Sequence, residues 1–434
     1  MRAYEMVIYR DMNQDEIFSN LCQVIDGYKK MEKAEVRKRI FQGISGLIEA
    51  GQSRGFRGNL WHIYITFLLA NDENSYSRFC EKKGTMEGSM TQLLRHDMEI
   101  IKYYMDFNWH EIEEYIGMEF VNLFDAFIPA AAKGVVFNQV LRDRMDALAV
   151  KLASEDIDSM CQEISSFYGE YGVGKFGLHK AFRIQHTDAE AKIVPIVNSS
   201  SVKLEDIVGY DLQKQQLIDN TQAFVEGKKA NNVLLYGDSG TGKSTSIKAI
   251  LNRYYKDGLR MIEIYKHQFQ DLNSVIAQIK DRNYKFIIYM DDLSFEESEL
   301  EYKYLKAVIE GGLEIKPDNV LIYATSNRRH LVKETWDDQK KIGDDIHGND
   351  SKQEKMSLFA RFGVAIYYGS PVKKEFLNIV HTLAEREGID LPKEVIEQKA
   401  IRWELTHGGF SGRAAEQVIT HLKGTKLDMD NKKI

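Results

Sequence analysis

The residues with the clearest chemistry are eight consecutive ones that combine glycines, hydroxyl groups and one lysine. They are Gly237, Asp238, Ser239, Gly240, Thr241, Gly242, Lys243 and Ser244. The run matches GxxxxGK[ST], in which backbone N–H groups surround a phosphate, the lysine reaches the β- and γ-phosphates and the last hydroxyl ligates magnesium. An apolar run at 233–236 precedes it and a helical pattern at 245–255 follows it. The sequence therefore predicts a phosphate-binding loop for ATP, with Ser244 as a ligand of Mg²⁺.

Two acidic residues follow another apolar run downstream. The segment 286–290 has the apolar character of a buried central strand, and Asp291 and Asp292 come directly after it. Because open α/β sheets bind ligands at the carboxyl ends of their strands, we expect both carboxylates at the phosphate-binding edge. We predict that Asp291 holds the magnesium ion through water and that Asp292 orients and polarises the attacking water. Glu296 and Glu297 are the alternative acids.

A polar triplet ends a further short apolar run. The segment 320–324 is followed by Thr325, Ser326 and Asn327. Here the chain resembles the AAA+ superfamily of ATPases, in which a polar residue at the end of the strand after the magnesium-binding one acts as the first sensor. The resemblance implies that Asn327 hydrogen-bonds the attacking water or the γ-phosphate. The alternative is that this asparagine only caps a turn.

Other superfamily marks occur in the expected order. Val208 and Gly209 lie in a segment that resembles the stretch packing on adenine. Arg361, within 358–363, resembles the arginine finger, and Arg413 resembles the second sensor at the start of a lid helix. A lone arginine is usually a surface residue, but the joint order favours these functional roles. Because an arginine finger adds on the order of 10³–10⁵ in rate and acts on a neighbour's site in this superfamily, the resemblance implies a homo-oligomer, typically a ring.

Within the superfamily, the segment 320–331 resembles a little-characterised bacterial group known only as a domain of unknown function. The predicted helix at 305–312 and the segment 316–319 fit the same group. The chain departs from the common pattern at Asp292, where the second acidic residue is usually Glu, one methylene longer. Initiator-like and helicase-loader-like members also carry a paired Asp, so the departure is compatible with slow ATP turnover.

The elements that must position these residues alternate between strand and helix. Short apolar runs lie at 233–236, 261–264, 286–290 and 320–324. Helical stretches lie between them, which is typical of a mostly parallel sheet in an α/β layer. After Pro371 the pattern predicts helices only, at 373–387, 393–406 and 413–423. We therefore expect an AAA+ α/β nucleotide-binding domain at 201–370 and a helical lid domain at 371–434.

Residues 1–200 are expected to form a mostly α-helical N-terminal domain and linker that binds a partner. Apolar spacing near 3.6 residues predicts helices at 35–51 and 141–157. Aromatic residues are dense at 103–127, which favours a helical core; the alternative is a cofactor site or a base-stacking platform. The polar, serine-rich stretch at 192–203 predicts an exposed connection.

The composition is that of an ordinary globular protein, 43% hydrophobic and 28% charged. A formal net charge of −7 gives no basic footprint for nucleic acid. The cysteines, Cys22, Cys80 and Cys161, are far apart and predict neither a disulfide framework nor a zinc site. No segment approaches the ~20 apolar residues of a membrane helix, and the first residues form no apolar leader. We expect no membrane contact and a cytoplasmic location.

Together these features predict a cytoplasmic AAA+ ATPase that couples ATP binding and hydrolysis to a conformational change on a macromolecular client. The sequence leaves open whether that client is a protein or a nucleic acid. The alternative function is a nucleotide-dependent binding switch with little hydrolysis. A small-molecule kinase is a third interpretation, but it explains neither the lid nor the two arginines.

Overall fold

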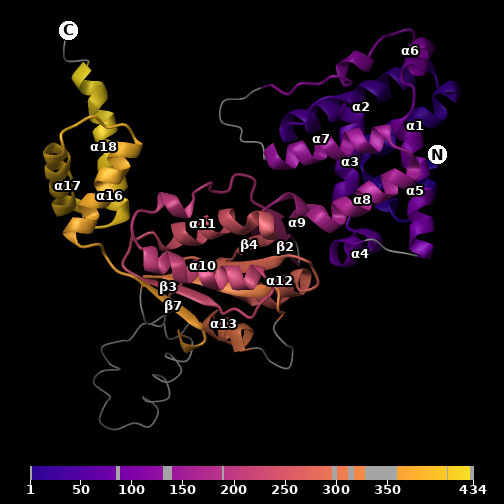
Figure 1. Ribbon diagram of the computed structural model, residues 1–434. Helices are drawn as coiled ribbons and strands as arrows, with labels where there is room; N and C mark the ends of the chain where they lie inside the picture. Colours follow the sequence, from indigo (N-terminus) through magenta and orange to yellow (C-terminus); the bar gives the residue numbers. More distant parts are fainter. Residues whose placement is uncertain are drawn as a thin grey trace. The chain divides into compact units, whose positions relative to one another are not determined.

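The computed structural model divides into two compact units, Met1–Leu178 and His179–Ile434 (Figure 1). The residues described by the structure are 2–84, 88–130, 139–187, 190–295, 301–310, 317–327, 359–407 and 409–430. The segment 328–331, which carries part of the family resemblance, lies outside these ranges, as do the alternative acids Glu296 and Glu297.

The first unit is mainly α-helical, as predicted. Its helices are α1 (Glu16–Gly27), α2 (Lys33–Arg54), α3 (Leu60–Asn71), α4 (Ser75–Lys83), α5 (Ser89–Met105), α6 (His110–Ile116), α7 (Gln139–Ser154), α8 (Ile157–Tyr171) and α9 (Gly174–Leu178). The helices predicted at 35–51 and 141–157 are confirmed as α2 and α7. Helix α7 ends a few residues before the predicted position. The reason is Asp156, whose side chain accepts a hydrogen bond from Ser159 N at 2.9 Å and thereby begins α8.

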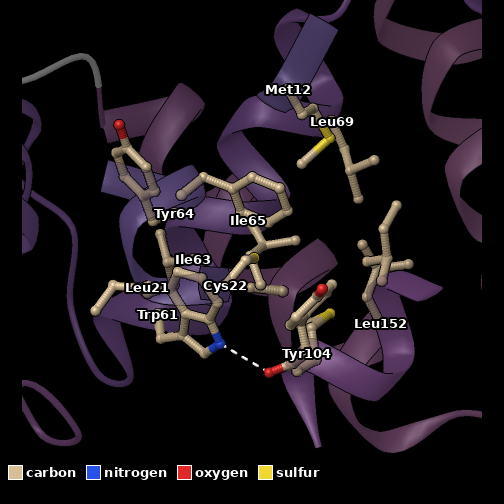
Figure 2. Packing of buried hydrophobic residues seen from close by; sticks show 14 of the residues in the cluster. Met12, Leu21, Cys22, Trp61, Ile63, Tyr64, Ile65, Leu69, Tyr104 and Leu152 are labelled. Carbon is tan, nitrogen blue, oxygen red and sulfur yellow. Dashed lines mark hydrogen bonds between the residues drawn. The ribbon is translucent and has the colours of Figure 1, made fainter. Parts of the chain in front are cut away.

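The core of the first unit is rich in aromatic side chains (Figure 2). Trp61, Tyr104, Trp109 and Phe124 are each at most 7% exposed. Trp61 Nε1 donates a hydrogen bond to the backbone oxygen of Tyr104 at 2.8 Å, and the Trp109 ring makes edge contacts with Trp61 and Phe124. These rings confirm the helical core predicted at 103–127 and are too deeply buried to stack on bases.

A seven-stranded sheet runs through the described part of the second unit. Its strands are β1 (Ala181–Thr187), β2 (Glu190–Pro195), β3 (Val233–Gly237), β4 (Leu259–Glu263), β5 (Lys285–Met290), β6 (Val320–Ser326) and β7 (Val364–Tyr368). Their order is β2-β1-β4-β5-β6-β3-β7, and every neighbouring pair is parallel except β1 with β2. The mostly parallel sheet is confirmed, and β3 to β6 are the four predicted runs.

The strands at the two edges of this sheet are not predicted by the sequence pattern. At one edge, β1 and β2 form an antiparallel hairpin in which Gln185 pairs with Lys192. The stretch 192–203 was expected to be an exposed connection, but its first residues are part of the sheet. Strand β1 joins the sheet by pairing with β4, with Ala181 beside Met261. Such a pairing depends on residues far apart in the chain, which local apolar periodicity does not reveal.

Helices pack on the sheet and bury its strands. They are α10 (Asp211–Val225), α11 (Lys243–Tyr254), α12 (Leu272–Ile279) and α13 (Glu301–Glu310). Leu217 of α10 and Ile247 of α11 belong to one core with Leu235, Ile287 and Leu321 of the sheet. Strand β6 is buried along its whole length, as expected for a central parallel strand.

The predicted helical lid is confirmed at the end of the second unit. It consists of α16 (Lys373–Arg386), α17 (Lys393–His407) and α18 (Gly412–Asp430) (Figure 1). Phe376, Ile396 and Val418 form a separate apolar core, against which Val208 also packs. Among the described helices of the whole chain, none has the length and apolar character needed to span a bilayer.

Candidate nucleotide-binding site

The predicted phosphate-binding loop connects β3 to α11 in a backbone conformation that needs glycine. Gly237 has φ 133°, and a Cβ there would lie 2.1 Å from the carbonyl oxygen of Tyr368. Asp238 N donates to that same oxygen at 3.0 Å, which fastens the loop to the end of β7. Gly242, with φ 92°, precedes the first turn of α11. The loop therefore ends at a helix N-terminus, where free N–H groups favour an anion.

Lys243 is 6% exposed and points back into its own loop. Its Nζ donates to the carbonyl oxygens of Gly237 at 3.0 Å and Asp238 at 2.5 Å, and to Oδ1 of Asn327 at 3.0 Å. Burial lowers the pKa of Lys243, while the Asp238 carboxylate opposes that shift. The loop carbonyls and the Asn327 amide thus hold a partly desolvated ammonium group where a phosphate would approach.

Asp291 meets Ser244 as predicted, and a third residue joins them. Ser244 Oγ donates to Asp291 Oδ1 at 2.7 Å, and Thr325 Oγ1 donates to the same oxygen at 2.6 Å. Burial raises the pKa of Asp291, but the hydrogen bonds from Thr325 and Ser244 outweigh it and lower the pKa below its ordinary value. A hydroxyl and an ionised carboxylate this close are the oxygen ligands that Mg²⁺ prefers, so the residues present fit this ion.

Asp292 has a left-handed backbone, with φ 50°. Its N–H donates to Thr325 Oγ1 at 2.9 Å, which holds the turn after β5 against the end of β6. Asn327 Nδ2 donates to Asp292 Oδ1 at 2.8 Å, so one asparagine links Lys243 to the second carboxylate. Left-handed φ is uncommon outside glycine, although Asp tolerates it, and such positions often occur at functional sites.

Thr325 contacts both acidic residues, although the sequence pattern predicts no function for it. Strand β6 lies between β3 and β5, and Met290 pairs with Ala324. The residues after Met290 therefore lie beside Thr325, whose hydroxyl bonds Asp291 and Asp292. A hydroxyl residue two positions before the predicted sensor was the available signal, but its use depends on strand register.

These residues line one cavity of about 630 Å³. From the predicted site it includes Val208, Ser239, Gly240, Thr241, Gly242, Lys243, Ser244, Asp291, Asp292, Asn327 and Arg413. Its apolar lining comes from Ile207 and Val208 before α10 and from Ile379 and Leu383 of the lid. Gly237 and Asp238 shape the loop from outside the lining, and Gly209 is exposed with φ 78°. The cavity thus has a charged end and an apolar end, which suits a nucleotide.

The segment before α10 contacts both the sheet and the lid. Ile207 packs with the core of the sheet and Val208 with the core of the lid. Arg386 of α16 donates to the carbonyl oxygens of Asp206 and Glu205, each at 2.8 Å. A ligand seated against this segment can therefore affect the position of the lid.

Arg413 and Arg361, the two predicted arginines, have different positions. Arg413 begins α18, its backbone N donates to Gly240 O at 3.2 Å, and it lines the cavity. Arg361 lies in the turn before β7 and is not among the lining residues. The other end of β7, Tyr368, meets the phosphate-binding loop, and five strand residues span about 16 Å. The structure brings Arg413 to the site of its own chain but not Arg361.

The fold and the site define a P-loop nucleotide-binding domain of the AAA+ type with a helical lid. Its loop follows β3, where the strand order reverses, and β6 separates this strand from the acidic residues after β5. The family profile described as "Protein of unknown function (DUF815)" matches residues 177–426. Since this is more than half of the chain, the protein belongs to that family.

Solved structures with a similar fold include RuvB, the Holliday junction branch migration motor of Thermotoga maritima. It is 16% identical over 50% of this chain and 63% of the RuvB chain, with a TM-score of 0.36. A RuvB mutant from the same organism is 15% identical over 53% of this chain and 67% of the other, with a TM-score of 0.38. The match thus spans less than two thirds of the first RuvB chain. No curated protein matches the sequence.

Proposed function

We propose that the protein is a Mg²⁺-dependent AAA+ ATPase that couples ATP binding and hydrolysis to conformational change on a macromolecular client. The observation that carries this proposal is the single hydrogen-bonded group that links the loop to two neighbouring strands. Asn327 bonds both Lys243 and Asp292, while Ser244 bonds Asp291. These are the groups that phosphate, magnesium and attacking water require, and they face one cavity of nucleotide size.

Each side chain has a defined task in this proposal. The N–H groups of the loop and the ammonium group of Lys243 bind the β- and γ-phosphates, and Ser244 and Asp291 hold magnesium. When bound, the ion neutralises charge that develops on the phosphate oxygens. Asp292 orients and polarises the attacking water, and Asn327 hydrogen-bonds that water or the γ-phosphate.

The apolar end of the cavity provides the coupling. Adenine packs on Val208, which is also part of the lid core, and Arg413 brings the first turn of α18 to the phosphates. ATP binding therefore closes the lid, and hydrolysis releases it. Arg361, at the far end of β7, acts on the ATP of a neighbouring copy, which makes the working form a homo-oligomeric ring. The first unit binds the client. Three buried free cysteines are compatible with the reducing cytoplasm, where we place the protein.

The test compares ATP binding and ATP cleavage in the purified chain and in Asp292→Asn. The amide keeps the size of the side chain but polarises water poorly, so binding should persist while phosphate release falls by on the order of 10²–10⁴. Asp257→Asn, an exposed change after α11, is the matched control. Wild-type turnover in Asp292→Asn would assign the water-polarising role to another acid.

A nucleotide-dependent switch with little hydrolysis is the second candidate. It is favoured by the hydrogen bond that Asn327 donates to Asp292 Oδ1, because this oxygen is then less available to water. Single-turnover cleavage, with protein in excess over labelled ATP, separates the two functions. A switch binds ATP and leaves it intact over many hours, whereas an ATPase converts it to ADP within minutes.

A further inference from the structure

Tyr289 is a buried tyrosine near the candidate magnesium site to which no role has been given. It belongs to β5, is 1% exposed, and lies in the core shared by the sheet with α10 and α11. Successive strand residues point to opposite faces, so Tyr289 lies on the same face as Ile287 and, at the end of the strand, Asp291. Both Tyr289 and Asp291 therefore point toward α11, whose Ser244 hydrogen-bonds Asp291.

The Tyr289 hydroxyl has no hydrogen-bond partner among the described residues. Two other tyrosines buried in the same core differ in this respect. Tyr323 Oη lies 2.8 Å from Thr221 Oγ1, and Tyr368 Oη donates to Ser246 Oγ at 3.1 Å. Tyr323 is also the strand partner of Tyr289 in the β5–β6 pair. A buried hydroxyl without a hydrogen bond destabilises the folded protein. Because the hydroxyls of Tyr323 and Tyr368 are hydrogen-bonded and that of Tyr289 is not, the Tyr289 hydroxyl calls for a ligand.

The surroundings of Tyr289 locate this hydroxyl beneath the first turns of α11. The Tyr289 side chain lines a cavity of about 190 Å³ together with Lys248 and Leu251 of α11. Ser244, Lys248 and Leu251 are spaced i, i+4 and i+7 and so share one face of that helix. The hydroxyl therefore lies beside the Ser244–Asp291 pair, close enough to both side chains to interact with them.

We infer that the Tyr289 hydroxyl donates a hydrogen bond to the hydration shell of the magnesium ion held by Ser244 and Asp291. This inference rests on the proposed function. Mg²⁺ usually keeps several of its waters in proteins, and groups that bond to such waters contribute to affinity and orientation. Tyr289 is thus a positioning residue, which acts on the nucleotide through the hydrated ion and makes no contact with it. Its donor is satisfied only when the site is loaded.

The first arm of the test measures stability without nucleotide. Tyr289→Phe removes a hydroxyl that bonds to nothing, so the melting temperature of the nucleotide-free chain should stay the same or rise. Tyr323→Phe is the matched control: it removes a bonded hydroxyl from the paired position of the next strand, and it should lower the melting temperature. A fall in Tyr289→Phe as large as that in Tyr323→Phe would show that the hydroxyl has a partner in the protein and would overturn the inference.

The second arm measures binding of a non-hydrolysable ATP analogue by calorimetry, with Mg²⁺ and with a chelator. In Tyr289→Phe the affinity gained from Mg²⁺ should fall by on the order of 10-fold, while affinity in chelator stays unchanged. Tyr323→Phe should keep the full gain. If wild type gains affinity from Mg²⁺ and Tyr289→Phe gains equally, the inference is wrong and the proposed function stands. If wild type binds no nucleotide under either condition, the proposed function itself fails.

Discussion

At the scale of single residues, Lys243 has the most specific arrangement in the site. Its ammonium group bonds the loop carbonyls of Gly237 and Asp238 and the Asn327 amide oxygen. A bound phosphate has to replace some of these hydrogen bonds. It can do so because a hydrogen bond between the ammonium group and a charged phosphate is stronger than one between the ammonium group and a neutral carbonyl. The loop is thus held in shape by the same side chain that it offers to the ligand.

Lys243→Ala tests this arrangement. It leaves the helix N-terminus but removes the charge that balances the phosphates, so the affinity for ATP should drop by on the order of 100-fold. Calorimetry measures the change, and Lys256→Ala, an exposed lysine after the same helix, should bind as wild type does. Equal affinities of Lys243→Ala and wild type would mean that the loop does not bind phosphate.

At the scale of elements, helix α3 in the first unit ends on a half-buried acid. Asp72 is the C-cap of α3. Its Oδ2 has no hydrogen-bond partner among the described residues, while Oδ1 accepts one from Asn74 Nδ2 at 3.2 Å. Burial raises the pKa of Asp72 to about 6, and the negative end of the helix dipole also disfavours its charge. The folded state therefore binds this proton more tightly than the unfolded chain does.

The sign of the resulting pH dependence follows from linkage. The unfolded pKa is about 3.9, so the stability contributed by Asp72 is highest below about pH 4, falls as the pH rises to about 6 and is constant above that. Asp72→Asn should raise the melting temperature at about pH 7 and change it little at about pH 4. Asp106→Asn, at the exposed C-cap of α5, is the control. Equal shifts for Asp72→Asn at both pH values would contradict the assignment.

At the scale of the whole molecule, the two arginines lie in different places. Arg413 lines the cavity of its own chain, whereas Arg361 lies at the opposite end of β7. The proposed ring gives Arg361 a target, because the turn before β7 can meet the cavity of a neighbouring copy. The two positions predict different behaviour when inactive chains are mixed.

Mixing experiments distinguish these arrangements. The Arg361→Ala chain keeps an intact nucleotide site, and the Lys243→Ala chain keeps an intact arginine finger. Each variant alone should be nearly inactive. When the two are mixed, some interfaces combine the intact site of one chain with the intact finger of the other, so ATPase activity should partly return. Arg413→Ala mixed with Lys243→Ala should recover nothing, since its site lacks its own arginine. Sedimentation confirms that subunits exchange. If exchange occurs and the first mixture stays inactive, Arg361 does not act in trans.

Local sequence was sufficient to predict the elements whose residue pattern extends over only a few positions. The loop at 237–244 needs glycines at fixed positions between a strand and a helix, and four central strands are apolar because both their faces are covered. The apolar residues of the lid helices recur at the helical period of about 3.6 residues. Each of these features is set by backbone sterics or by local burial, so a single chain segment predicts it.

Only the tertiary structure decided which side chains meet across strands. Strand β6 lies between β3 and β5, and this order places Thr325 on both acidic residues and Asn327 between Lys243 and Asp292. Strands β1 and β7 join the sheet by pairing with β4 and β3, which are distant from them in the sequence. Strand order and register are set by packing of the whole sheet, and they are therefore absent from any local pattern of residues.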